Sequence, residues 1–398
     1  MLIEIILFLL LGIVFGTFTG LIPGIHINLI GAILVSLSAS VFYLINPIYI
    51  AVLITSMAIT HTFIDFIPSI FLGAPDTDTE LSILPGHDLL KKGLGYEAII
   101  LTAYGSLAAV FILILISFPS ILIISKIYIY MKSLIPYILI AVSLVLIFSE
   151  KNKFSALFVL LLTGFLGLSV LNLAENSEKF LLPLLTGLFG SSMLLISIKN
   201  KTKIPKQKIT KPNINLFRPL LGAAIVSPIF SFLPGLGSGQ AAIIGNTISR
   251  TNKKGFLVLI GATNTLVMGF SFISLYIISK TRTGAAVSIQ KIIGTLSWEM
   301  LVLILVVVFF SGIIAFFITI FLAKFFSKKM EKVNYTLLSS ITLLLLTIVV
   351  FLVSGFIGII ILIVSTFTGI YSISLGVRRT NMMGVLLIPT ILFYLFSI

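Results

Sequence analysis

Two ionisable side chains stand four residues apart inside an apolar stretch, THTFIDFIPS at residues 60–69. His61 and Asp65 would lie on one face of a helix, because residues four apart are neighbours on a helical surface. Such groups are costly inside an apolar helix, and they usually mark a proton or ion pathway. We expect this pair to carry a proton or to bind a coupling cation. A structural buried pair, or a helix end nearer the interface with water, is the competing interpretation.

A Pro-Gly pair interrupts apolar sequence twice, in LIPGIHIN (21–28) and in FLPGLGSG (232–239). A bilayer tolerates such a break only where protein or water satisfies the freed backbone groups. A helix beginning after each break would present unpaired N–H groups and a partial positive charge to an anion. A kink in a packed helix, with small residues allowing close approach, is the alternative. The substrate-binding residues predicted here are Pro23, Gly24, His26, Asn28, Pro234, Gly235, Gly237, Ser238, Gly239 and Gln240.

Two short polar segments carry opposite charges at corresponding positions. GAPDTDTELSILPGHD (73–88) is acidic, and SKTRTG (279–284) is basic. We expect the two segments either to form ion pairs with each other or to bind different ions. In the second case the basic segment receives an anionic substrate and the acidic segment binds a cation. Two solvated loops with unrelated charges are the alternative. An offset of 204 residues places Asp76 over Lys280, Asp78 over Arg282, Thr77 over Thr281 and Thr79 over Thr283.

The elements that carry these residues are predicted to be membrane helices. Of 398 residues, 59% are apolar and 10% charged, and the mean hydropathy is +1.24. Many apolar runs exceed the roughly 20 residues that cross a bilayer, so we expect an all-α, multi-pass protein of about 10–12 helices in the cell membrane. The first segment, from Leu2, is interpreted as a membrane helix rather than a signal peptide. The net charge of +14 fits basic loops between helices better than nucleic-acid binding.

The order of basic loops predicts the topology. KNKTKIPKQKITK (199–211) holds six lysines and no acid, so we place it in the cytoplasm, which puts the N-terminus outside. The segments 73–95, 150–153, 250–254, 324–332 and 378–379 then fall inside. Each half is expected to hold a broken, re-entrant-like hairpin, one span, a polar segment and four more spans. An odd number of crossings separates the halves, which predicts an inverted repeat of residues 1–198 and 216–398 around a linker at 199–215. Pro119 is expected to end a span, with 120–131 along the interface.

These segments resemble the TctA family, the large membrane subunit of tripartite tricarboxylate transporters. GLIPGIHIN and SFLPGLGSGQ look like the family's G-x-x-P-G segments, and LGAPDTDTELSILPGHDLLKKG (72–93) is similar to a polar segment in its first half. GATNT (261–265) stands where the second half of the family has an Asn-containing polar segment, which adds Asn264 to the expected substrate-binding residues. The resemblance implies a permease for tricarboxylates that works with a small membrane subunit and an extracytoplasmic binding protein. This chain is shorter than typical members and looks closer to the stand-alone archaeal relatives.

We therefore expect a secondary transporter of a small organic anion, a di- or tricarboxylate, coupled to an H⁺ or Na⁺ gradient by alternating access. We expect neither an enzyme nor a bound cofactor or metal, and self-association is left open. A polyprenyl-phosphate translocase would use the same broken-helix ends for a phosphate head group. An intramembrane lipid-modifying enzyme, with His26, His61, Asp65 and Asp76 in acid-base roles, is a remote alternative, and a purely structural membrane protein is another. P-loop, dinucleotide-binding, H-E-x-x-H and G-x-S-x-G sequences are absent.

Overall fold

The structure is a computed structural model that describes residues 2–22, 31, 34–35, 45–72, 79, 82–173, 177–199, 205–233, 237–329 and 334–396. Within these ranges every regular element is a helix and none is a strand. Nine helical stretches of the described chain are long and apolar enough to cross a membrane. The prediction of an all-α, multi-pass membrane protein is confirmed.

The helices follow one another with short connections. The first part of the chain forms α1 (Leu2–Leu21), α3 (Pro47–Ile64), α4 (Phe66–Leu72), α5 (Ile83–Lys91), α6 (Gly95–Phe148), α7 (Lys153–Leu171), the 3-10 turn η2 (Ser177–Phe180), α8 (Leu181–Leu185), the π-helical turn η3 (Thr186–Ser191) and α9 (Ser192–Lys199). The second part forms α10 (Phe217–Phe230), α11 (Ser238–Ser249), α12 (Lys253–Ile278), α13 (Gly284–Ile293), α14 (Trp298–Lys329), α15 (Tyr335–Ser374), the 3-10 turn η5 (Arg379–Met383) and α16 (Gly384–Phe396). Asn46 and Asn252 cap the starts of α3 and α12 with their side-chain oxygens.

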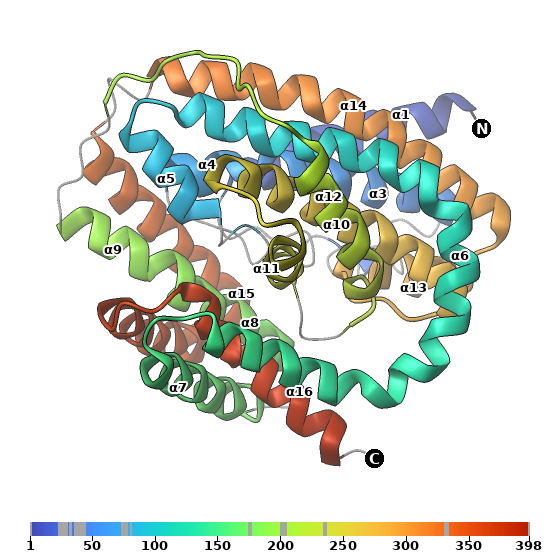
Figure 1. The fold of residues 1–398 in the computed structure, drawn as a ribbon. Helices are drawn as coiled ribbons and strands as arrows, with labels where there is room; N and C mark the ends of the chain where they lie inside the picture. The colour runs from blue at the N-terminus through green and yellow to red at the C-terminus, as the bar shows by residue number, and fades with distance from the viewer. Residues whose placement is uncertain are drawn as a thin grey trace.

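The helices form two groups, which Figure 1 shows one above the other. The larger group holds α1, α3, α4, α5, the start of α6, α10 and α12 to α14, and the smaller holds the end of α6, α7, α8, α9, α15 and α16. α11 packs on α10 and α12 and contributes to the apolar cluster that reaches the smaller group. All of an 18-residue apolar stretch of α3–α4 is buried inside the protein, and 94% of the corresponding stretch of α12 is buried. In α1 the buried share is 22%. Polar side chains on α3 and α12 therefore face protein rather than lipid.

One helix joins the two groups. α6 runs for 54 residues through Pro119 and Pro136, about 81 Å at 1.5 Å per residue. Figure 1 shows it bending round from the larger group to the smaller one. The helix continues through Pro119, because a proline removes one backbone hydrogen bond and kinks a helix that its neighbours hold in place. The end of a membrane span at Pro119, with 120–131 along the interface, stays a prediction. Where α6 crosses α12, Gly105 and Gly261 let the two backbones touch, and Ser106 Oγ donates to the Gly261 carbonyl at 3.0 Å.

α15 contains two arms separated at Gly355. Gly355 has a φ of 64° and a ψ of −157°, a backbone conformation that only glycine adopts readily. Because this conformation is not helical, the helix changes direction at Gly355. Both arms contact the stretch from η2 to α9: Ser354 Oγ donates to the Lys179 carbonyl at 2.6 Å, and Gly187 lies against Ser365. The two arms correspond to two of the four spans predicted after the polar segment of the second half.

The Pro-Gly break in the second half separates two antiparallel helices. α10 ends at Phe230 and α11 begins at Ser238. Gly222 on α10 faces Gly245 on α11, so the chain turns back on itself as predicted. In the first half, residues 23–30, which hold the corresponding Pro-Gly pair, lie outside the described residues; Gly31, directly after them, packs against Ser288 of α13.

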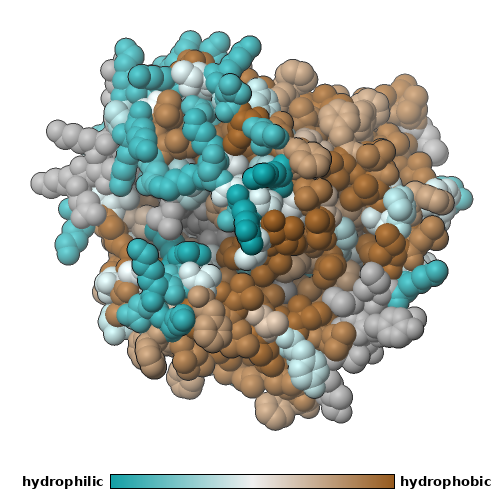
Figure 2. Space-filling model, in the orientation of Figure 1, coloured by the Kyte–Doolittle hydropathy of each residue, from teal (hydrophilic) through white to brown (hydrophobic). Residues whose placement is uncertain are grey.

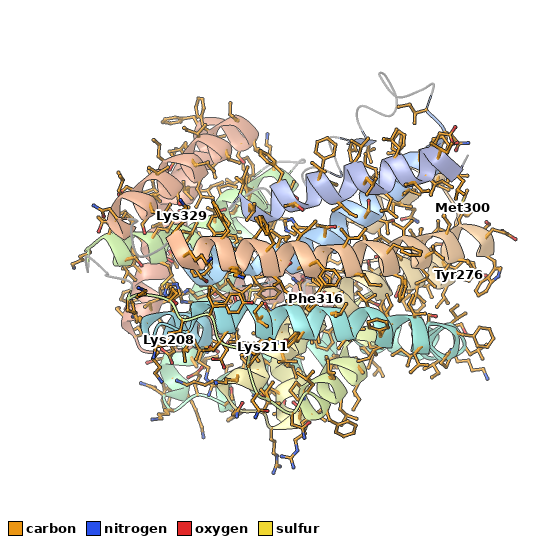
Figure 3. The ribbon with its side chains drawn as sticks, turned by 90° about the horizontal axis from the view of Figure 1, so that it is seen from above. Lys208, Lys211, Tyr276, Met300, Phe316 and Lys329 are labelled. Carbon is orange, nitrogen blue, oxygen red and sulfur yellow. The ribbon has the colours of Figure 1, made fainter. Side chains whose placement is uncertain are left out.

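Several segments predicted to share one side of the membrane are in contact. Lys253 pairs with Asp88 at 2.5 Å, and Lys254 pairs with Glu97 at 2.5 Å. The linker joins them through Lys208, whose backbone N–H donates to the Gly93 carbonyl at 2.7 Å. Figure 3 shows Lys208, Lys211 and Lys329 toward one end of α14, opposite to Met300 and Tyr276. Figure 2 shows hydrophilic side chains gathered toward the left of the view, while apolar side chains cover much of the remaining surface, as lipid contact requires.

Candidate functional site

The two enclosed helices meet through polar side chains. Thr62 on α3 and Thr265 on α12 face each other, with their hydroxyl oxygens 3.1 Å apart. One turn further along, Asn264 Nδ2 donates to Asp65 Oδ2 at 3.0 Å and approaches the Thr62 carbonyl at 3.5 Å. The Asp65 and Asn264 residues are each 4% exposed. A hydrogen bond to a buried carboxylate typically contributes about 1.5–3 kcal/mol, so this contact fixes the two helices against each other.

Asp65 stands where the chain bends between α3 and α4. Pro68 has no N–H to donate to the carbonyl of Ile64, which weakens the helix at this point. Ser69 donates both its N–H and its hydroxyl to the next carbonyl, that of Asp65, at 3.3 and 2.7 Å, which holds the chain just after the weakened point. The bend aims the Asp65 side chain at α12.

The beginning of α11 completes the cluster. Ser238 Oγ lies 3.5 Å from Asn264 Oδ1, so the first residue of α11 lies beside the amide that holds Asp65. Gln240 turns back and accepts a hydrogen bond from the Gly237 N–H at 2.6 Å, which caps the helix. Gly237, Ser238, Gly239 and Gln240 are all buried. A helix N-terminus, an amide and a carboxylate therefore share one buried place, which we call the α3–α11–α12 cluster (Thr62, Asp65, Ser238, Asn264 and Thr265).

His61 also lies beside α1. Its Nδ1 is 3.1 Å from Thr19 Oγ1, and the hydroxyl of Thr19 is 3.2 Å from the Gly16 carbonyl. His61 is 4% exposed. The direct pairing of His61 with Asp65 stays a prediction.

The basic segment after α12 reaches the end of α10. The Arg282 N–H donates to the Ser231 carbonyl at 3.2 Å, and Ser231 Oγ lies 2.8 Å from Ser274 Oγ. Arg282 is thereby placed where the chain leaves α10 toward the start of α11. Lys280 is exposed at the end of α12, about 21 Å of helix beyond Asn264. The structure thus places the Arg282 backbone against the end of α10, whereas Lys280 is exposed.

Matching hydroxyl pairs anchor both polar segments. Ser69 Oγ lies 2.6 Å from Thr79 Oγ1 in the first half, and Ser271 Oγ lies 2.6 Å from Thr283 Oγ1 in the second. Thr79 and Thr283 are the residues that the offset of 204 had aligned. Sequence reasoning missed the serines as well as Thr62 and Thr265. A signal was present: T-H-T at 60–62 and T-N-T at 263–265 are related by an offset of 203.

The remaining predicted site residues lie outside the described part of the chain. They are Pro23, Gly24, His26, Asn28, Asp76, Thr77, Asp78, Pro234 and Gly235. Their binding and coupling roles stay predictions, as does the pairing of Asp76 and Asp78 with Lys280 and Arg282.

Comparison with known proteins gives the family. The model of the family described as "Tripartite tricarboxylate transporter TctA family" matches residues 6–384. The chain is also 35% identical, over 401 aligned residues, to a protein of Methanocaldococcus jannaschii described as uncharacterized, covering 98% of this chain and 99% of that protein. No solved structure gives a significant match. The chain therefore belongs to the TctA family of tripartite tricarboxylate transporters.

Proposed function

We propose that this protein is a secondary transporter of a small organic anion, a di- or tricarboxylate, coupled to an H⁺ or Na⁺ gradient. The observation that carries the proposal is the Asp65–Asn264 hydrogen bond beside the beginning of α11. The N-terminal end of α11 favours an anion. The carboxylate of Asp65 repels one, unless a proton or a cation neutralises it.

Because the N-terminus of α11 favours an anion and the Asp65 carboxylate repels one, binding of the substrate anion is linked to binding of the coupling cation. An anion that enters the α3–α11–α12 cluster is stabilised when Asp65 has already taken up a proton or Na⁺, because like charges in a buried site repel strongly. The cation would therefore bind with the anion and travel with it. Asp65 is the proposed coupling residue, and Thr62, Ser238, Asn264 and Thr265 supply neutral oxygens and N–H groups around it.

The arrangement of helices supports alternating access. We infer that residues 1–198 and 216–398 are inverted repeats, because Ser69–Thr79 and Ser271–Thr283 are matched contacts and Thr62 meets its counterpart Thr265. A residue that touches its own counterpart lies next to the axis relating the two halves. The cluster would lie near that axis, where transporters built from inverted repeats place their substrates.

Transport in proteoliposomes tests the proposal. Wild-type protein should take up a di- or tricarboxylate when an inward H⁺ or Na⁺ gradient is imposed. Asp65→Asn keeps the shape but cannot be charged, so gradient-driven uptake should fall to the background level. Exchange of labelled for unlabelled substrate, which needs no net cation movement, should persist in the same variant.

The control and the contrary outcomes are well separated. Glu299→Gln removes a carboxyl group at the exposed start of α14 and should transport like wild type. Full gradient-driven uptake by Asp65→Asn would contradict the coupling role. Absence of carboxylate uptake by wild type, together with binding of polyprenyl phosphate, would favour the lipid-carrier translocase instead.

Membership of a tripartite family also suggests partners. We propose that the basic linker 199–215 faces the cytoplasm and that the N-terminus lies outside, on the charge of the loops. An extracytoplasmic binding protein would then deliver the anion to the end of the molecule that holds Tyr276 and Met300, opposite to Lys208 and Lys329. A small membrane subunit is the second proposed partner.

A further inference from the structure

A buried arginine lies apart from the α3–α11–α12 cluster. Arg379 begins η5, and the residue is 6% exposed. Its Nη2 points at the sulfur of Met193, a weak acceptor, and its Nη1 is buried with no hydrogen-bond partner in the described part of the chain. A buried guanidinium with an unsatisfied N–H is unfavourable, and such a group calls for an explanation.

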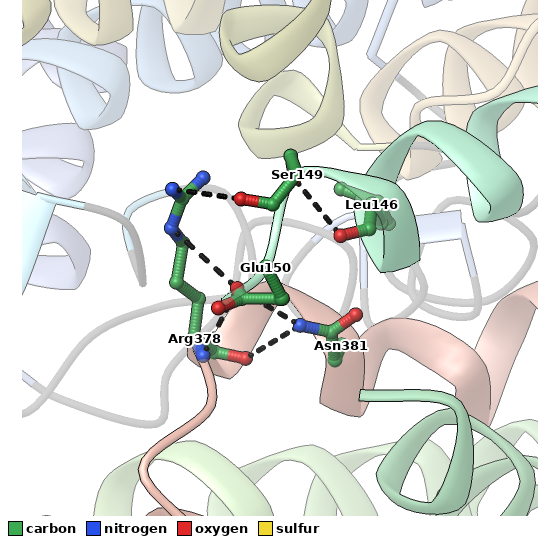
Figure 4. Close-up of polar contacts among 5 residues, drawn as sticks. All are labelled: Leu146, Ser149, Glu150, Arg378 and Asn381. Atoms are coloured by element: carbon green, nitrogen blue, oxygen red, sulfur yellow. Dashed lines mark hydrogen bonds and ion pairs between the residues drawn. The ribbon is translucent and has the colours of Figure 1, made fainter. Parts of the chain in front are cut away.

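The neighbouring carboxylate is already engaged elsewhere. Glu150 Oε1 accepts hydrogen bonds from the Arg378 N–H and from Asn381 Nδ2, each at 3.2 Å, and it lies 3.5 Å from Arg378 Nε. Arg378 also donates to the Ser149 carbonyl at 3.2 Å. Figure 4 shows this network, in which Glu150 bonds to Arg378 and Asn381. Glu150 thus balances the exposed arginine and not the buried one.

A second basic side chain lies on the helix that follows α4. Leu72, at the end of α4, packs against the cluster of Leu194 and Leu346, and Leu194 follows the Met193 that Arg379 contacts. His87 is on α5, and its Nε2 is buried with no hydrogen-bond partner among the described residues. Burial, with a smaller contribution from the charge of Arg379, lowers the pKa of His87 from 6.5 to about 4. Lys91 acts in the same direction and Asp88 opposes it. Two buried nitrogen groups therefore lie within electrostatic range of each other. Arg379 Nη1 donates in any state, and His87 Nε2 donates when the imidazole is protonated or carries its proton on Nε2.

The two side chains come from different groups of helices. Gly86, next to His87, packs against Ile70 of α4 in the larger group. Gly384, just after η5, packs against Leu160 of α7 in the smaller group. An anion held by both side chains would join the two groups at the end of the molecule where the linker and Lys253 lie.

We propose that His87 and Arg379 form a second anion subsite, which binds one carboxylate or phosphate group between α5 and η5. Guanidinium and imidazole donors suit both oxyanions. The bound group neutralises Arg379 and satisfies its free N–H. The binding itself does not depend on Asp65, and the subsite stands even if the protein transports nothing.

Thermal unfolding of the full chain in neutral detergent tests the subsite. Arg379→Met keeps the length of the side chain and removes its charge. In chloride buffer without an added oxyanion this variant should melt at or above the wild-type temperature, because an unsatisfied buried charge has been removed. An added oxyanion should raise the Tm of wild type by several degrees, and the variant should lose most of that rise. Arg218→Met, the same change at an exposed arginine, should keep the full rise.

Three probes at matched ionic strength identify the source of the oxyanion. They are a tricarboxylate, inorganic phosphate and a short-chain phosphatidic acid. Protection of wild type by the tricarboxylate, lost in Arg379→Met, would assign the subsite to a transported anion. Protection by phosphatidic acid alone would assign it to a lipid headgroup, and protection by phosphate to a free ion. Retention of the full Tm rise in Arg379→Met, or no rise in wild type with any probe, would overturn the proposal.

His87 is expected to make the smaller contribution. His87→Gln keeps one donor, so it should weaken anion binding less than Arg379→Met does. Binding titrations of the same probes should give a Kd increase of at least about tenfold for Arg379→Met and a smaller one for His87→Gln. Asp65→Asn should leave this binding unchanged, which separates the subsite from the proposed coupling site.

Discussion

The two halves of the chain share a framework but differ in chemistry. Both have an Asn-capped enclosed helix, α3 or α12, and both anchor the segment after it through a Ser–Thr contact of 2.6 Å. Within T-H-T and T-N-T, the outer threonines match while His61 corresponds to Asn264. Asp65 corresponds by the same offset of 203 to Met268.

This difference shows how a site with one coupling group can arise in a repeated framework. The hydroxyl pairs are neutral, so each half can keep its own copy without cost. A second buried carboxylate at position 268, one helical turn along α12 from Asn264, would disfavour the charged form of Asp65. Instead the second half supplies an amide, and Asn264 donates to Asp65 across the contact between the halves. The asymmetry is what lets one carboxylate be held by a neutral partner.

The strongest way to break this asymmetry is to remove the amide. Asn264→Leu removes the hydrogen bond that Asp65 Oδ2 accepts from the amide, and it removes the contact with Ser238. A hydrogen bond to a charged group is worth about 1.5–3 kcal/mol, so gradient-driven uptake should fall by roughly tenfold to a hundredfold. Initial rates in proteoliposomes, corrected for protein incorporated, measure this.

The control for Asn264 is a second asparagine in the same half. Asn246, near the end of α11, accepts from Thr251 and stands away from Asp65. Asn246→Leu should therefore reduce uptake much less. Equal losses in the two variants would show that the amide at 264 matters for folding and not for Asp65.

The sequence predicts the helices better than the contacts between them. Hydropathy places α12, α14 and both arms of α15, because a span needs a long apolar run whatever its neighbours. The break before α11 was predictable from Pro234-Gly235 for the same local reason. The Asp65–Asn264 bond joins residues 199 apart, and only the T-H-T and T-N-T match hints at it. The path of α6 through Pro119 depends on tertiary packing, which local rules do not contain.

The His87–Arg379 subsite was missed for a related reason. In the sequence His87 belongs to an acidic segment. Arg379 is one of two neighbouring arginines, and such a basic pair indicates only which side of the membrane a loop is on. Nothing local distinguishes the buried Arg379 from the exposed Arg378. Burial between two groups of helices gives Arg379 its significance, and burial here is a property of the assembled fold.

A second comparison between the halves concerns pH. The offset of 204 places Lys291 over His87, yet Lys291 is exposed on α13 while His87 Nε2 is buried. Burial lowers the pKa of His87 from 6.5 to about 4, with Arg379 as a further cause. Between these values the unfolded chain binds a proton that the folded chain does not. The stability that the neutral imidazole contributes is therefore complete above pH 6.5 and is lost as the pH falls toward 4.

Unfolding measured at pH 7 and at pH 4.5 checks the sign. The loss attributable to His87 should be at most about 3 kcal/mol, and His87→Gln should show a correspondingly flatter dependence. Lys291→Gln should follow the wild-type curve. A steeper curve for His87→Gln than for wild type would mean that the imidazole is held in its charged form in the folded protein.

The smallest expected effect gives the sharpest test of equivalence between the halves. Thr79→Val and Thr283→Val each replace a hydroxyl by a methyl group and leave the volume nearly unchanged. Each removes one buried contact of 2.6 Å to a serine, Ser69 or Ser271. A neutral hydrogen bond contributes about 1 kcal/mol, so the two variants should lose similar stability, and the double variant should lose the sum if the contacts are independent. Denaturant titration in detergent measures all three. A loss of stability in only one variant would show that one Ser–Thr hydrogen bond holds its segment in place and the other does not. Equal geometry with unequal contributions to stability would mean that the two segments have different roles in the transport cycle.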